Sequence, residues 1–339
     1  MNSILITGAT GLVGFEVYDR LREQAGVTVV GTSRRGSPRR PDVVRWSLGA
    51  QPPPSGLEGP WDVVVHTAAD VRWSLSPEQA YRANVDTVSA LTPLVSERTR
   101  VIHVSTAYAG GHRDDVSSAD PGDYRNSYEW SKAYAERRAR ELFPRLTVIR
   151  PPLIIGRSRD GRAARFSGLY TLVRGIATGT VPAIAADARA RLDLVPVDAV
   201  ADLILEAARE PAATGAVWTL AGGERALETG VVLGIIMDAL NQWRRVAGHA
   251  PVEPPRIIPP ERWNRFFRPF ARDQLTQRQN LMLDLLSAFD PYLAATVPLT
   301  PTHTVGGVEG CLRHSIGYWA AANQRLAAMT PRPWRPAAG

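Results

Sequence analysis

The 339-residue sequence is short of several residue types, and each shortage excludes a class of structure. A single cysteine, Cys311, cannot form an intramolecular disulfide, which favours a reducing compartment. There is no run of about 18 apolar residues and no basic segment leading into an apolar stretch at the start, so neither a membrane-spanning helix nor a secretory signal is predicted. We therefore expect a soluble protein of the cytoplasm. The six histidines and the cysteine lack the spacing of metal ligands, so no metal site is predicted.

Lysine is almost absent as well. Lys132 is the only one, and arginine supplies the other basic residues. The 40 basic residues outnumber the 33 acidic ones and give a net charge of +7. An excess of arginine suits nucleic acid, an acidic protein partner or a phosphorylated ligand, and genomic base composition explains it equally well. No nucleic-acid partner is predicted from it.

Three glycines spaced three residues apart follow the first apolar run of the chain. Gly8, Gly11 and Gly14 stand between the run Ile4–Ile6 and an amphipathic segment that begins at Phe15. Strand, glycine turn and helix in this order are typical of a dinucleotide-binding fingerprint. Gly8 suits the tight turn, Gly11 lets the backbone approach a pyrophosphate, and Gly14 lets the helix pack closely on the strand. The helix N-terminus would present free N–H groups and the positive end of its dipole to the phosphates.

The second predicted strand, Val27–Thr32, ends in Ser33, Arg34 and Arg35 with no carboxylate nearby. An NAD-selective site usually has an acidic residue here, which accepts the ribose 2′-hydroxyl. A carboxylate would repel a 2′-phosphate, whereas guanidinium groups bind it in a bidentate manner. The strand end therefore predicts NADP(H); a solvated basic loop is the alternative.

Strands and helices alternate over about the first 150 residues. Further strands are predicted at Val43–Trp46, Asp62–Ala69, Val101–Thr106 and Leu146–Arg150, with helical segments at Pro77–Glu97 and Tyr128–Leu142. This alternation predicts an α/β fold with a doubly wound parallel sheet, whose right-handed crossovers bring the carboxyl ends of the strands to one edge. The strand ending in Ala68 and Ala69 is largely apolar, which suits a position buried on both faces of the sheet. The small alanine side chains at its end would let a cofactor pass close to the backbone. His66 is interpreted as a packed strand residue.

Beyond Pro151 the alternation loosens and helices dominate. The segments predicted there are a strand at Asp193–Asp198, a helix at Val200–Ala208, a strand at Val217–Leu220, and helices at Val231–Val246 and Gln274–Phe289. We expect residues 1–155 to form the dinucleotide-binding domain. Residues 156–339 would form a mostly helical C-terminal substrate-binding cap, with some segments, about 190–220, returning to the first domain.

Tyr128 and Lys132 are four residues apart and share one face of the predicted helix. An ammonium group beside a phenol favours the phenolate, so we expect Lys132 to lower the pKa of Tyr128 and make it a proton donor and acceptor near neutrality. Arginine is used everywhere else, so the single lysine marks a place where arginine would not serve. Thr106, at a strand end, could hold a substrate oxygen while Tyr128 protonates it. A surface helix that carries this pair by chance is the alternative.

Together these motifs resemble the extended short-chain dehydrogenase/reductase superfamily. They are Thr7–Gly14, His66–Ala69, Asn84–Val85, Val104–Tyr108 and Tyr128–Lys132. The segments Ser127–Glu136 and Ile149–Gly156, followed by Arg157–Gly161, are similar to the thioester reductase branch, with its male-sterility-type NAD-binding domain. That branch includes fatty acyl-CoA reductases and the terminal reductase domains of carboxylic acid reductases and of nonribosomal peptide and polyketide synthases. The resemblance covers about residues 1–220.

The resemblance implies a Rossmann-type fold, NADPH as cofactor and a set of site residues. The catalytic set it implies is Thr106, Tyr128 and Lys132, supported by Asn84. The residues it implies for NADPH are Gly8, Thr10, Gly11, Leu12, Val13, Gly14, Ser33, Arg34, Arg35, Ala68, Ala69, Tyr128, Lys132, Pro151, Pro152, Leu153 and Ile154. The two prolines would lie beside the nicotinamide.

The implied reaction is the reduction of an acyl thioester, carried by CoA or by an acyl carrier protein, to an aldehyde and in part to the alcohol. The sequence contains no carrier or adenylation domain, so we expect a standalone enzyme of secondary metabolism, monomeric or dimeric, that meets its thioester in trans. Two alternatives stay open. One is a superfamily member acting on a free ketone, aldehyde or alcohol, or a sugar-nucleotide epimerase or dehydratase. The other is a regulator that binds NADP without turnover.

Overall fold

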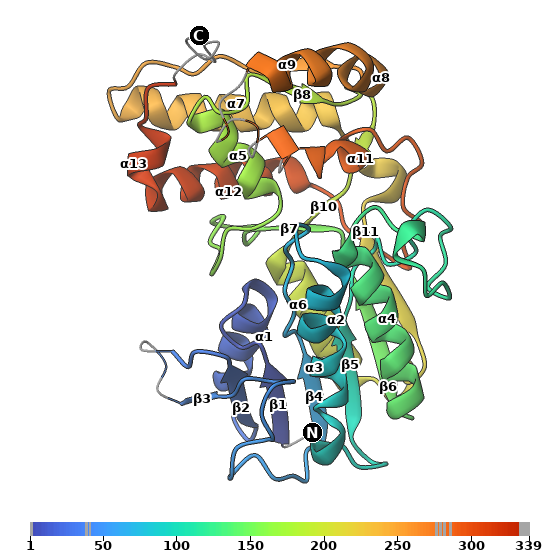
Figure 1. The fold of residues 1–339 in the computed structure, drawn as a ribbon. Coiled ribbons are helices and arrows are strands. Elements are labelled where there is room, and N and C mark those ends of the chain that lie inside the picture. The colour runs from blue at the N-terminus through green and yellow to red at the C-terminus, as the bar shows by residue number, and fades with distance from the viewer. Residues whose placement is uncertain are drawn as a thin grey trace. The chain divides into compact units, whose positions relative to one another are not determined.

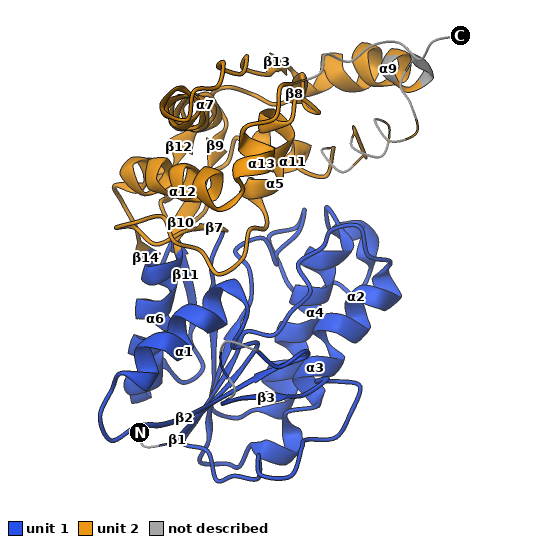
Figure 2. Cartoon of the chain, turned by 90° about the vertical axis from the view of Figure 1, so that its left-hand side faces the viewer, with its two compact units in different colours: residues 1–152, 197–220, 301–303 blue, residues 153–196, 221–300, 304–339 orange. Residues whose placement is uncertain are grey.

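The computed structural model describes residues 3–37, 40, 42–274, 277, 280, 283–284 and 287–331. The chain divides into two compact units, coloured separately in Figure 2. Unit 1 comprises residues 1–152, 197–220 and 301–303, and unit 2 comprises residues 153–196, 221–300 and 304–339. Each unit is therefore built from segments that are distant in the sequence.

Unit 1 alternates strands with helices (Figure 1). Its strands are β1 (Ser3–Thr7), β2 (Thr28–Ser33), β3 (Val43–Arg45), β4 (Val63–His66), β5 (Arg100–Val104), β6 (Leu146–Arg150) and β11 (Val217–Ala221). Its helices are α1 (Leu12–Arg22), α2 (Pro77–Asn84), α3 (Asp86–Ser89), α4 (Ser127–Leu142) and α6 (Val197–Arg209), with short 3₁₀ turns η1 (Thr92–Leu94), η2 (Pro121–Asp123) and η3 (Pro211–Ala213).

Among the described residues, eight strands form one sheet in the order β14-β11-β6-β5-β4-β1-β2-β3, where β14 is His303–Thr304. All neighbouring pairs from β11 to β3 are parallel. The order of the strands reverses between β1 and β4, which is the topological switch point where α/β proteins open a crevice for a dinucleotide. The predicted doubly wound parallel sheet is confirmed.

Helices cover both faces of this sheet. In Figure 2, α1 and α6 lie on one side, and α2, α3 and α4 lie on the other; within each group the helices contact one another. The central strands are consequently buried on both faces, as in β4, where all four residues are buried.

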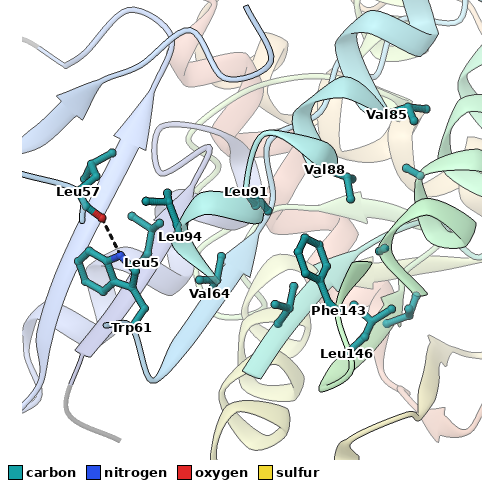
Figure 3. Close-up of a cluster of buried hydrophobic side chains, with 14 of the residues drawn as sticks. Leu5, Leu57, Trp61, Val64, Val85, Val88, Leu91, Leu94, Phe143 and Leu146 are labelled. Atoms are coloured by element: carbon teal, nitrogen blue, oxygen red, sulfur yellow. Dashed lines mark hydrogen bonds between the residues drawn. The ribbon is translucent and has the colours of Figure 1, made fainter. Parts of the chain in front are cut away.

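A large apolar cluster lies between the sheet and the helices α3 and α4 (Figure 3). Val64 of β4 meets Val88 and Leu91 from the α3 region and Phe143 at the end of α4. Trp61 extends the cluster beyond the sheet edge, and its indole N–H donates to the carbonyl oxygen of Leu57 at 3.0 Å. Burial of this apolar area fixes α4, and so the predicted site residues at its start, against β5 and β6.

Unit 2 is mostly helical with short strands. Its helices are α5 (Leu169–Ala177), α7 (Thr229–Val246), α8 (Pro260–Arg262), α9 (Arg268–Gln274), α11 (Asp290–Leu293), α12 (Val308–Ala322) and α13 (Gln324–Ala327), with the 3₁₀ turn η4 (Gly223–Arg225) and the π-helical turn η5 (Trp263–Phe267). Its strands pair as β7 (Leu153–Ile155) with β10 (Leu194–Pro196), β9 (Arg191–Leu192) with β12 (Leu227–Glu228), and β8 (Ala183–Ala185) with β13 (Arg256–Ile258). In the part of the chain that the structure describes, no helix is long and apolar enough to cross a bilayer.

Two predicted helices need comment. The segment Pro77–Glu97 is not one helix but three short ones, α2, α3 and η1. Pro93 lies in the first turn of η1, where its missing N–H cannot continue a helix from the preceding turn. Most of the helix predicted at Gln274–Phe289 lies outside the described residues.

Candidate active site

The glycine turn connects β1 to α1 and is shaped by close contacts. Gly8 has φ +76°, and a Cβ there would approach the backbone nitrogen of Ala68 to 2.8 Å. Gly11 donates its N–H to the carbonyl oxygen of Gly8 at 2.8 Å, which closes the turn. A methyl group on Gly14 would overlap that same carbonyl oxygen and the hydroxyl of Thr67. The turn therefore admits only glycine at Gly8 and Gly14.

The N-terminus of α1 is suited to an anion. Its N-cap residue is Gly11, which has no side chain to cap the helix, and its first turn has no acidic residue. The first amides of a helix have no intrahelical carbonyl to bind, and the dipole adds partial positive charge there. Thr10, Leu12 and Val13 belong to this turn and helix start. This helix start is suited to a dinucleotide pyrophosphate.

The end of β2 carries the two arginines predicted to recognise a 2′-phosphate. Ser33 is buried and donates its hydroxyl to the carbonyl oxygen of Gly36 at 3.0 Å, whereas Arg34 and Arg35 are exposed. The sequence shows no carboxylate close to these arginines along the chain, but the loop after β4 contains Asp70, which lies near Arg34 in the fold. The pKa of Asp70 lies below its usual range, mainly through its hydrogen bonds with Arg72 and in small part through the charge of Arg34. Arg72 binds both carboxylate oxygens, at 2.8 to 3.2 Å, and so neutralises this acid locally.

Asn84 connects the loop after β4 to α4. Its amide oxygen accepts the N–H of Asp70 at 2.7 Å, and its amide nitrogen donates to the carbonyl oxygen of Asp70 at 3.1 Å and to the hydroxyl of Ser131 at 2.8 Å. Ser131 in turn donates to the carbonyl oxygen of Tyr128 at 2.9 Å. The side chain is buried, and both its amide oxygen and its amide nitrogen are hydrogen-bonded, so Asn84 positions the loop of Ala68 and Ala69 against α4.

Thr106 follows β5, and backbone hydrogen bonds of its two neighbours attach it to β6 and to the residue after it. The flanking N–H of Ser105 donates to Ile149 at 2.7 Å, and that of Ala107 donates to Pro151 at 2.9 Å. Pro151 and Pro152 are buried at the end of β6. Leu153 and Ile154, which were predicted with them, begin β7 and pair with β10 in unit 2.

Tyr128 lies in the first turn of α4, whose N-cap is Asn126. The Asn126 side chain accepts the N–H of Glu129 at 3.0 Å, and the fully buried Glu129 carboxylate binds Arg125 at 3.1 Å. Burial raises the pKa of the Tyr128 phenol well above its usual value, and a hydrogen bond with Thr106 opposes the rise. The two hydroxyls predicted to hold a substrate oxygen therefore lie close enough for Thr106 to influence the Tyr128 phenol.

The expected effect of Lys132 on Tyr128 is wrong for this structure. The pKa of Tyr128 is raised, not lowered, because burial outweighs the hydrogen bond with Thr106, and Lys132 makes no resolved contribution. Lys132 is 2% exposed, and its Nζ donates to the carbonyl oxygen of Val104 at 2.8 Å. Burial also lowers the pKa of Lys132 to about 8, with Glu136 opposing.

Two polar groups of this region were not singled out from the sequence, and the buried environment of a third was not predicted. Ser105, next to Thr106, has a buried hydroxyl with no hydrogen-bond partner among the described residues. His103 contacts Lys132, and Asp70 lies near the basic end of β2. The hydroxyl at Ser105 was visible in the sequence as part of the strand end; the other two depend on contacts between distant segments.

Comparison with known proteins agrees with this geometry. Residues 56–204 match the NAD-binding family described as "Male sterility protein". Fatty acyl-CoA reductase 1 of Xenopus laevis and that of Gallus gallus are each 29% identical over 184 residues, covering 43% of this chain and 36% of the relative. The chain thus spans about a third of the length of the curated relatives it matches.

Solved structures share the fold at low sequence identity. The terminal R domain of the myxalamid PKS-NRPS pathway has a TM-score of 0.70 at 19% identity, covering 97% of this chain and 93% of that one. A thiolation-reductase di-domain of an archaeal nonribosomal peptide synthetase has a TM-score of 0.65 at 17% identity, with 96% and 76% covered. UDP-glucuronic acid 4-epimerase of Bacillus cereus, in complex with NAD, has a TM-score of 0.59 at 16% identity, with 94% and 99% covered.

The parallel sheet and the glycine turn give the chain the Rossmann-type fold that these solved structures share. Residues 56–204 match the male sterility family, to which the motifs had pointed.

Proposed function

We propose that the protein is an NADPH-dependent reductase that converts a CoA- or carrier-bound acyl thioester to an aldehyde and, on prolonged exposure, to the alcohol. The observation that carries the proposal is the proximity of Thr106, after β5, to Tyr128, at the start of α4, within a segment that matches the male sterility family. The curated relatives in frog and chicken are named fatty acyl-CoA reductases. A hydroxyl pair of this kind suits a carbonyl oxygen that gains negative charge.

The glycine turn and the N-terminus of α1 would hold the cofactor pyrophosphate, because they present free amides in a cradle with no side chain in the way. Pro151 and Pro152 would lie beside the nicotinamide, and Lys132 would bind the nicotinamide ribose. When bound, the cofactor supplies a hydride to the thioester carbonyl carbon. Ala68 and Ala69 would leave room for it at the end of β4.

Tyr128 and Thr106 would hold the carbonyl oxygen and stabilise the charge that develops on it. A phenol with a raised pKa is protonated at neutral pH, so Tyr128 starts the step as a donor and gives its proton to the oxygen. The product is a thiohemiacetal. The Tyr128 phenolate then takes the hydroxyl proton back, the C=O bond forms, the C–S bond breaks, and the thiolate leaves and gains a proton from solvent.

The preference for NADPH would come from the exposed guanidinium groups of Arg34 and Arg35 at the end of β2. The charge of Arg34 acts on Asp70, which Arg72 already neutralises. A 2′-phosphate would therefore meet positive charge at this point. Unit 2 would supply the acyl-binding cap.

A second candidate is a dehydrogenase of free carbonyl compounds or a sugar-nucleotide epimerase. The likeness to the Bacillus cereus epimerase over 94% of the chain shows that the fold is compatible with it. Incubating the pure protein with NADPH and a panel of acyl-CoA, acyl carrier protein, free ketone and UDP-sugar substrates separates the two. We expect NADPH oxidation with thioesters; oxidation with the ketone alone, or sugar epimerisation, would transfer the assignment to the second candidate.

A further inference from the structure

Two buried histidines lie side by side next to helix α4, which carries Tyr128 and Lys132. His66 on β4 and His103 on β5 are direct partners in the parallel register, and their rings stack at a centroid distance of 5.3 Å and an interplanar angle of 23°. Each is 1% exposed. Sequence reasoning interpreted His66 as a packed residue, but packing alone does not require two polar rings in a dry interior.

The stacked pair connects the glycine turn to the lysine. Thr7 is the register partner of His66 and the residue before Gly8, and its hydroxyl lies 2.7 Å from His66 Nδ1. At the other end, His103 Nε2 lies 3.5 Å from Lys132 Nζ. Four side chains from β1, β4, β5 and α4 thus form one continuous row.

The protonation states follow from the chemistry of the groups. Burial lowers the pKa of His66 to about 3 and that of His103 well below its usual value, so both rings are neutral at physiological pH. An ammonium group has only donors. His103 Nε2 accepts in a contact with protonated Lys132, and the ring proton of His103 is then on Nδ1, a buried atom with no hydrogen-bond partner among the described residues.

We propose that His103 is a positioning residue for Lys132: its neutral imidazole accepts a hydrogen bond from the ammonium, holds Nζ beside the Val104 carbonyl and favours the charged form of the lysine. His66 keeps the His103 ring in orientation by stacking, and Thr7 fixes His66. The importance of this role for turnover rests on the proposed function, in which Lys132 binds the cofactor ribose. The contact itself does not depend on it.

Few other charges act on Lys132. Glu136, on the same helix, favours the protonated form, but Arg150 binds both of its oxygens at 2.7 and 2.9 Å, and Arg140 binds one at 3.0 Å. The charge of Arg140 also acts on His103. With Glu136 largely neutralised, the hydrogen-bond acceptors at the ammonium among the described residues are the Val104 carbonyl and the imidazole on β5. Loss of the imidazole should destabilise the charged form, because an unpaired buried donor retains its desolvation cost.

The single lysine allows a direct test on the unmodified enzyme without substrate. Biosynthetic incorporation of lysine labelled with ¹³C at Cε gives one resonance, that of Lys132, whose shift with pH reports its protonation. We expect His103→Phe to move the midpoint down by about one pH unit or more, a tenfold change in the protonation equilibrium. His103→Gln, which keeps an acceptor, should stay near the wild type, and so should His112→Phe, the same change at an exposed histidine.

An unchanged or raised midpoint in His103→Phe, or an equal drop in His103→Gln, would overturn the proposal. A second measurement needs no variant. In ¹⁵N-histidine-labelled protein below the Lys132 midpoint, His103 Nε2 should resonate as an unprotonated nitrogen and Nδ1 as a protonated one. The reverse assignment would also refute the proposal. Because neither experiment uses a thioester, failure here is distinguishable from failure of the proposed reaction.

Discussion

At the scale of single residues, the site combines a phenol that burial keeps protonated with a lysine that burial brings towards neutrality. The pKa of Tyr128 is raised and that of Lys132 falls to about 8, both mainly through desolvation. A protonated phenol is the form that can donate to a developing oxyanion. In the proposed reaction, Tyr128 would therefore start as the acid.

Tyr128→Phe should keep the fold and NADPH binding but lower turnover about 10²- to 10⁴-fold, the usual contribution of a positioned proton donor. Thr106→Ala should have a milder effect, because one hydroxyl is only part of the oxyanion site. Steady-state kinetics and cofactor titration by fluorescence would measure both. A near-wild-type rate in Tyr128→Phe would mean that the pair on α4 has no catalytic role.

Lys132→Met should stabilise the folded protein while reducing turnover. The pKa of Lys132 is about 8 in the fold against 10.5 ordinarily, so its protonated form costs stability below pH 8, by roughly 3 kcal/mol at about 1.4 kcal/mol per unit. The cost declines between pH 8 and 10.5 and vanishes above. Denaturant unfolding of both proteins at pH 7 and pH 10.5 should show the gain at the lower pH only. An equal gain at both pH values would point to packing instead of charge.

The sequence predicted the identity of these residues but not their couplings. The Tyr128–Lys132 spacing, Thr106 and Asn84 were all recognisable from their order along the chain. The direction of the Tyr128 pKa shift was not, because it depends on how far α4 is buried. The contact between His103 and Lys132 joins positions 29 residues apart, and neither the strand pattern around His103 nor the helix pattern around Lys132 predicts it.

At the scale of elements, the turn from β1 to α1 is the most constrained part of the site. Gly14→Ala would drive a methyl group into the Gly8 carbonyl and the Thr67 hydroxyl, pushing α1 away from the turn. We expect a destabilisation of about 1–3 kcal/mol and loss of dinucleotide binding. Thermal unfolding and cofactor titration would measure these.

The matched control is Gly234→Ala, the same change in the exposed face of helix α7, where a Cβ meets nothing within 4 Å. It should raise stability by up to about 1 kcal/mol through helix propensity and leave cofactor binding unchanged. Should Gly14→Ala behave like this control, the close packing of α1 on the turn would be refuted.

The end of β2 tests the cofactor assignment. Arg34→Ala combined with Arg35→Ala should weaken NADPH binding by a few kcal/mol, at about 1.5–3 kcal/mol per charged hydrogen bond, and hardly change NADH binding. Isothermal titration with both cofactors would measure the difference. Equal losses for the two cofactors, or a wild-type preference for NADH, would contradict NADPH specificity.

Element prediction was most accurate where the local pattern was clear. The strand Leu146–Arg150 has the predicted bounds, and the helix predicted from Tyr128 begins one residue earlier as α4. The three-residue strand β3 was predicted, but β7 and β13 were not, because so short a run has no periodic pattern. The division of Pro77–Glu97 into three helices was also missed, although Pro93 marked one of the breaks.

At the scale of the whole molecule, two units are assembled from interleaved segments of one chain. The sequence indicated a return to the first domain near residues 190–220, and the structure assigns residues 197–220 to unit 1. It did not indicate that residues 301–303 belong there too, because a three-residue segment has no pattern of its own. The match to the male sterility family spans residues 56–204, so it does not include residues 221–300 and 304–339 of unit 2.

The most direct measurement is a single turnover with one equivalent of NADPH, an acyl-CoA or acyl carrier protein thioester, and a hydrazine to trap aldehyde. A thioester reductase should form one hydrazone and one free thiol for each NADPH oxidised, and Tyr128→Phe should form neither at a comparable rate. If no thioester yields aldehyde or alcohol while a free ketone is reduced, thioester reduction is not the activity of this protein.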